Sequence, residues 1–236
     1  MTLFQYDAAV QNRFPSVVGG AILARGLSNG PTPPPLLDAF LAEQRATLER
    51  LGGTPLSELP SLAAWRRVFS GFGVKPTQYR SAAEALLRRL TKQGDSPSLN
   101  ALVDLGNLVS IRYALPVAIF DLAETTGAIT VALARGDERF TPLGESEVEQ
   151  PEPGEVIFVD AAGLVSARRW CWRQSQQSAA HAGTRDALIT VEGHHERARD
   201  EVRAALDDLM ALLGAHQPQA ALTAALLTRD APRFSL

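Results

Sequence analysis

Residues 100–121 have the sequence NALVDLGNLVSIRYALPVAIFD, and this stretch decides which fold the chain can adopt. Leu102, Leu105 and Val109 recur at steps of three and four residues, which predicts a helix over residues 100–110. Pro116 cannot continue a helix and favours extended geometry in the residue before it. We therefore expect a helix that leads directly into a short strand over residues 117–121.

Asn107 lies inside this apolar helix and interrupts its hydrophobic surface. A buried amide that finds no hydrogen-bond partner costs roughly 1–3 kcal/mol, so Asn107 must be satisfied in some way. It can be a capped residue of the core, or it can face a pocket and bind a ligand. The residues alone leave both interpretations open.

The composition is that of an ordinary globular protein, with 45% hydrophobic and 21% charged residues. No apolar stretch is long enough to span a bilayer, and the N-terminal residues lack the basic region of a secretory signal. The single cysteine, Cys171, excludes an intramolecular disulfide and a cysteine-rich zinc site. These features predict a cytoplasmic protein, and none of them indicates a cofactor. The net charge of −3 argues against avid non-specific nucleic-acid binding but permits a local basic patch.

The remaining periodicities predict an α+β fold in which helices pack on a mixed β-sheet, with further helices added at both ends. We expect the helices at residues 38–51, 59–69, 81–93, 196–214 and 219–228. Strands are expected at residues 128–134, 155–160, 164–173 and 186–192, and residues 17–23 form another buried β-type run. This predicts an N-terminal extension (1–60) packed on a central domain (61–195), followed by a C-terminal helical extension (196–236).

The densest polar and aromatic segment is RRWCWRQ at residues 168–174. A continuous strand would place Arg169, Cys171 and Arg173 on one face, and Arg168, Trp170 and Trp172 on the other. Two indoles beside three guanidinium groups suit stacking on a base and pairing with phosphate. An amphipathic strand with core tryptophans and solvated arginines is the alternative.

Two other segments could form a phosphate-binding or a metal-binding site, but neither matches a known motif. Residues 70–76 form a glycine-rich turn that aims Lys75, and its spacing fits neither the Walker nor the Rossmann phosphate loop. The adjacent His194 and His195 would point to opposite faces of a strand, and no second cluster of ligands supports them. We therefore predict no metal site.

Several landmarks together resemble a known family. Residues from about Leu62 to His195 resemble the B3/B4 domain, the editing module of the β subunit of bacterial phenylalanyl-tRNA synthetase, which also exists as freestanding proteins. The landmarks are FGVKP (72–76), SAAEAL (81–86), NALVDLGN (100–107), Pro116 with Phe120-Asp121, and Thr184 leading to Val191-Glu192. The segment 168–173 looks like that of the freestanding branch. No catalytic-core motif of a synthetase is present, which argues against ATP-dependent aminoacylation.

The resemblance implies hydrolysis of the ester that joins a wrong amino acid to tRNA, so tRNA with an aminoacylated 3′ end is the expected partner. It implies that Asn107 hydrogen-bonds the substrate and that Glu192 recognises a polar group. Trp170 is then expected to shape the pocket, and the other substrate-binding residues would be Lys75, Arg168, Arg169, Trp172, Arg173 and Thr184.

Two departures from the family pattern affect specificity. Ala118 stands where the synthetase motif has a histidine, and Arg168, Cys171 and Trp172 stand where it has glycines that leave room for the amino acid. Bulkier side chains should reshape the pocket, which argues against tyrosine as the amino acid. The alternative function is a non-catalytic module that binds RNA, a free amino acid or a protein.

Overall fold

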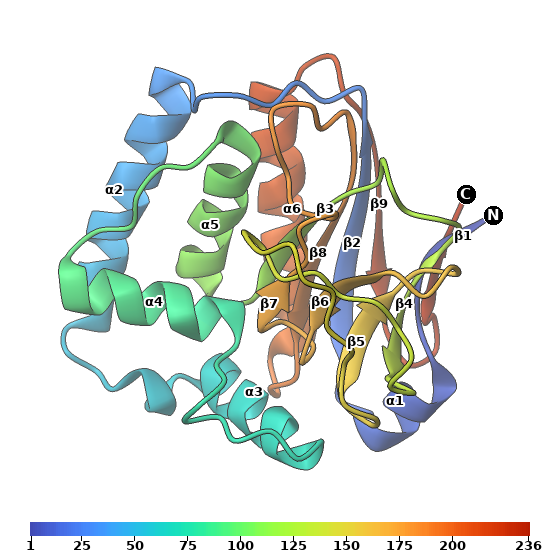
Figure 1. Cartoon of the computed structure of the whole chain (residues 1–236). Helices are drawn as coiled ribbons and strands as arrows, with labels where there is room; N and C mark the ends of the chain where they lie inside the picture. Colours follow the sequence, from blue (N-terminus) through green and yellow to red (C-terminus); the bar gives the residue numbers. More distant parts are fainter.

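Two β-sheets and the helices packed around them make up the computed structural model, which describes residues 1–236 (Figure 1). The antiparallel four-stranded sheet has the order β3 (Val117–Asp121), β8 (Asp186–Gly193), β2 (Val18–Arg25), β9 (Ala221–Leu227). The six-stranded sheet has the order β10 (Arg233–Ser235), β1 (Thr2–Tyr6), β4 (Ile129–Leu133), β5 (Val156–Val159), β6 (Val165–Arg168), β7 (Arg173–Gln174). Its β1 and β4 are parallel and its other pairs antiparallel. The α+β class and the mixed sheet are confirmed, but the strands form two sheets where one was expected.

Strand β2 lies between the two hydrophobic cores of the molecule. Its Ile22 and Ala24 belong to the core that α5 (Ala101–Tyr113) and α6 (Ala198–His216) form against the four-stranded sheet. Its Ala21 and Leu23 belong to the second core, which lies between the two sheets. Strand periodicity thus places alternate side chains of β2 in different cores. Helix α2 (Pro34–Leu51) and helix α4 (Ala82–Gln93) pack against α5, while α1 (Ala8–Arg13), η1 (Leu56–Glu58) and α3 (Pro60–Gly71) complete the fold.

Local sequence signals account for helix α5. The Asn100 side chain caps its first turn by accepting the N–H of Val103 at 3.0 Å. The buried Asp104 carboxylate accepts hydrogen bonds from the Thr32 hydroxyl at 2.6 Å, the Leu99 N–H at 3.0 Å and the Ser98 hydroxyl.

None of the helices combines the length and the apolarity needed to cross a membrane.

Two secondary-structure predictions are wrong. Residues 219–228 were expected to be helical because they are rich in alanine and leucine, but residues 221–227 form β9 and pair with β2 along its length. Tertiary pairing here outweighs the local helix propensity. Residues 164–173 are not one strand either, because β6 ends at Arg168 and a turn precedes β7. Arg169 and Trp170 have φ values of 44° and 61° in that turn, so the two-face arrangement expected for this segment does not occur.

The terminal segments take part in both sheets. β2 is a central strand of the four-stranded sheet, and β10 pairs with β1 at the edge of the six-stranded sheet. The first and last residues lie side by side (Figure 1), and the Met1 ammonium donates to the Leu236 carbonyl at 2.6 Å.

Candidate functional site

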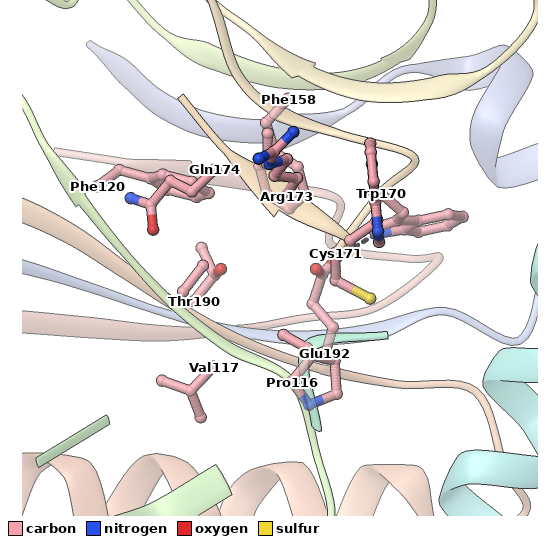
Figure 2. Close-up of a pocket in the computed structure, with 14 residues that line it drawn as sticks. Pro116, Val117, Phe120, Phe158, Trp170, Cys171, Arg173, Gln174, Thr190 and Glu192 are labelled. Carbon is pink, nitrogen blue, oxygen red and sulfur yellow. Dashed lines mark hydrogen bonds between the residues drawn. The ribbon is translucent and has the colours of Figure 1, made fainter. Parts of the chain in front are cut away.

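A pocket opens between β3, β8 and the turn that joins β6 to β7 (Figure 2). Its cavity volume is about 70 Å³, well below the roughly 300–1,000 Å³ of typical ligand sites, so the bulky side chains around it leave little room. Ala118 and Phe120 come from β3, Thr190 and Glu192 from β8, and Trp170 from the turn. The lining is mostly apolar, so its few polar groups must fix the orientation of any ligand.

Glu192 is the buried acid of this pocket, with only 2% of its surface exposed. Its Oε1 accepts the Tyr6 hydroxyl at 2.7 Å and the Trp170 indole N–H at 3.0 Å. Burial raises the pKa of Glu192 from 4.5 to about 7, and the two hydrogen bonds oppose that rise. Both protonation states are therefore populated near neutral pH, which suits a group that binds a cation or exchanges a proton.

Trp170 holds the turn in place. Its fully buried ring makes edge-to-face contacts with Phe14 and Trp65, each at 5.3 Å between centroids, and with His194 at 4.9 Å. The next residue, Cys171, lines the pocket, and its carbonyl accepts the N–H of Ala82 at 2.7 Å. Burial and the nearby Glu192 raise the pKa of the Cys171 thiol well above its usual value. The thiol stays protonated, so the pocket has no activated cysteine nucleophile.

The three arginines of the segment are balanced by glutamates of residues 142–155, which we call the acidic loop. Arg168 is buried and pairs with Glu155 at 2.9 Å and Glu149 at 2.6 Å. The Arg169 guanidinium lies 4.0 Å from the Tyr79 ring centroid and 4.6 Å from that of Trp172, with Glu152 at 3.8 Å. Arg173, at the pocket, pairs with Glu145 at 3.2 Å. None of these arginines is free to meet a phosphate without giving up a partner.

The structure brings together some of the residues predicted from sequence and separates others. Trp170, Trp172, Arg173 and Glu192 line the pocket, whereas Asn107, Lys75, Arg168, Arg169 and Thr184 do not. Asn107 is half-buried on α5, and Lys75 is exposed in the turn after α3. Thr184 is buried, and its hydroxyl accepts the N–H of His181 at 2.9 Å.

Three residues of the site were not predicted from the sequence. Thr190 could have been found, because the two-residue period of a strand puts it on the same face as Glu192. Gln174, whose amide donates to the Ile119 and Ser178 carbonyls at 2.7 Å, ends the polar segment that was singled out. Tyr6 carried no signal, since it reaches Glu192 from the other end of the chain.

The side chains of the adjacent His194 and His195 both contact other side chains of the protein. His194 lies against Trp65 and Trp170, and burial together with His195 lowers its pKa from 6.5 to about 3. His195 Nε2 lies 2.8 Å from a Glu201 carboxylate oxygen. No group of three or more His, Cys, Asp or Glu side chains gathers as a metal site requires.

Comparison with known proteins confirms the resemblance predicted from the sequence. The model of the B3/4 domain family matches residues 64–213. The phenylalanine–tRNA ligase β subunit of Shewanella oneidensis is 33% identical over 99 residues, which are 42% of this chain and 12% of that subunit. The corresponding subunit of Acinetobacter baylyi is 31% identical over 138 residues, or 58% of this chain and 16% of that subunit. The chain thus spans only a small part of the length of these relatives.

A solved structure is also similar, an N-terminal fragment of the phenylalanyl-tRNA synthetase β-subunit from Pyrococcus horikoshii. Its TM-score is 0.49 at 14% sequence identity, and the match covers 94% of this chain and 50% of that one.

Proposed function

Because the chain belongs to the B3/4 domain family, we propose that it is a cytoplasmic hydrolase that removes a wrong amino acid from tRNA. The aminoacylated 3′ end would enter the pocket, and the amino acid would lie against Glu192. The observation that carries this proposal is a buried carboxyl group with a pKa of about 7 at the wall of a pocket in this family's domain. The related subunits are named as parts of a tRNA ligase, which supports tRNA as the substrate.

The reaction needs no protein nucleophile. Water adds to the ester carbonyl, the carbon–oxygen bond to the ribose breaks, and the ribose oxygen leaves with a proton as a hydroxyl. Ionised Glu192 would hold the α-ammonium or a polar group of the amino acid and so fix the ester relative to the attacking water. Arg173 and Trp172 line the pocket beside that end of the substrate. We give Asn107 no part in this proposal, since it does not line the pocket.

One observation favours a second candidate, a module that binds the charged tRNA end without hydrolysing it. The position of the family's histidine is occupied by Ala118, which carries no group able to transfer a proton. Such a module would use the same pocket for recognition alone.

A panel of mischarged tRNAs tests both candidates. Wild type should deacylate at least one member, and Glu192→Gln should change which amino acid is removed while melting cooperatively. The matched control is Glu196→Gln, which makes the same chemical change at an exposed carboxylate four residues further on. Binding of charged tRNA without deacylation of any member would favour the second candidate. An unchanged preference in folded Glu192→Gln would remove Glu192 from the site.

A further inference from the structure

Positive charge is concentrated on α3, α4 and the turn between them. From Pro60 to Gln93 the only acidic residue is Glu84, whereas the basic residues are Arg66, Arg67, Lys75, Arg80, Arg88, Arg89 and Lys92. This segment has a formal charge of +6 in a chain of net charge −3, so the remainder carries −9. Charge separated in this way focuses a positive potential on one part of the surface.

Most of these cations have no carboxylate partner. The buried Glu84 binds Arg66 through two hydrogen bonds, at 3.0 and 2.5 Å, and lies 3.6 Å from Arg80. No carboxylate oxygen lies within 4.0 Å of the other five, which are all exposed: Arg67, Lys75, Arg88, Arg89 and Lys92. We call these five residues the basic face. Unlike Arg168, Arg169 and Arg173, which the acidic loop balances, the five residues of the basic face have no ion-pair partner.

Helix α4, which carries Arg88, Arg89 and Lys92 of the basic face, begins at the pocket. Ala82, the first residue of α4, lines the pocket and is bonded to Cys171. From there α4 runs outward from the strands toward α2 (Figure 1) for about 18 Å, at 1.5 Å for each of its 12 residues. Tyr79 and Trp172 lie at the junction, with ring centroids 4.9 Å apart. Such half-buried rings can stack on the bases of a single strand.

We propose that the basic face binds the phosphate backbone of an RNA whose single-stranded 3′ end enters the pocket. This rests on the proposed function for the identity of that end. A phosphate backbone is a row of single charges and needs only cations along its path. A protein partner would need apolar or aromatic residues to bury at the interface. The only exposed apolar residue of α4 is Ala85, so this helix does not supply them.

Salt-dependent binding of a labelled, uncharged RNA minihelix with a single-stranded 3′-CCA end tests the proposal. The test variant is Arg88→Gln/Arg89→Gln/Lys92→Gln. The matched control is Arg199→Gln/Arg203→Gln/Arg229→Gln, which removes three exposed arginines that also have no carboxylate oxygen within 4.0 Å. Each lost phosphate contact should lower the logarithmic salt slope by about 0.7–0.9, so the test variant should lose about 2. Its affinity at low salt should fall at least about tenfold, while the control keeps the wild-type slope.

The outcomes separate this inference from the proposed function. A wild-type slope in the folded test variant, an equal loss in the control, or no binding of the minihelix by wild type would each overturn the role of the basic face. Deacylation by wild type with an unchanged KM in the test variant would sink this inference and leave the hydrolase standing. If the salt slope depends on the basic face but no tRNA is deacylated, RNA binding by the basic face stands and the hydrolase proposal fails.

Discussion

Glu192 and His194 are two residues apart, and burial favours the neutral form of both. The pKa of Glu192 rises to about 7 and that of His194 falls to about 3, in each case mainly because a charge is costly in the aromatic interior. A raised carboxyl pKa means that stability falls as pH rises from 4.5 to about 7. A lowered imidazole pKa means that stability falls as pH drops from 6.5 to about 3. Between pH 4.5 and 6.5 the two slopes have opposite signs and largely cancel.

We expect Glu192→Gln to uncover the contribution of His194. The amide cannot ionise, so the variant should gain stability relative to wild type as pH rises from 5 to 7. The gain is about 1.4 kcal/mol per pH unit and reaches about 3 kcal/mol above pH 7. Urea denaturation of both proteins at several pH values measures it. A constant difference across this range would show that the folded-state pKa of Glu192 is not raised.

The Tyr6 hydroxyl should control how far Glu192 is shifted. Its hydrogen bond favours the ionised carboxylate, so Tyr6→Phe should raise the pKa of Glu192 further above 7. Stability should fall by about 1 kcal/mol through the lost buried bond. Titration of the Glu192 side-chain carboxyl by carbon NMR gives the shift. Tyr113→Phe is the control, because it removes a hydroxyl bonded to Asp208 on α6. An equal shift of the Glu192 pKa in both variants would show that the Tyr6 hydroxyl does not control it.

Within β2, Gly19 makes room for the contact between Tyr6 and Glu192. Gly19 lies directly opposite Glu192 in the sheet, and a Cβ there would lie only 2.1 Å from the Tyr6 hydroxyl oxygen. Gly19→Ala should therefore displace the Tyr6 ring and cost about 1–3 kcal/mol. Gly30→Ala, where a Cβ would meet nothing within 4 Å, should change stability by less than about 0.5 kcal/mol. Equal melting temperatures for the two variants would contradict this packing.

Elements whose signals are local could be predicted from the sequence. Helix α5 follows from its apolar period and its Asn100 cap, and β8 from its run of β-branched residues. Strand β9 could not be predicted, since its alanines and leucines favour a helix until β2 pairs with them. The turn at Arg169 and Trp170 was also hidden, because residues other than glycine seldom adopt positive φ and packing around Trp170 enforces it. The same holds for the site, where Glu192 was recognised and its partner Tyr6 was not.

Across the whole molecule, the acidic loop pairs with the arginines beside the pocket, so an RNA bound as proposed would have to compete with it for them. Glu145 pairs with Arg173 near the surface, so Glu145→Gln should free this guanidinium at a stability cost below about 1 kcal/mol. We expect this variant to bind the RNA minihelix more tightly than wild type at low salt, with a steeper salt slope. Fluorescence anisotropy measures both. Glu147→Gln, which changes a loop glutamate without an ion pair, controls for net charge. If both variants bind equally tightly, the gain reflects overall charge alone.

The pairing of β1 with β10 makes the covalent path of the chain almost a closed ring. A short glycine linker from Leu236 to Met1 would complete that ring across a gap already spanned by a hydrogen bond. The ring could then be opened at Gly53, an exposed residue near which a Cβ would meet nothing. We expect such a circular permutant to keep the circular dichroism spectrum of wild type and to melt cooperatively. The permutant begins at Gly53, so β1 and β2 are the last strands to be synthesised. If it folds, the pairing of the strands does not depend on the order in which they are synthesised.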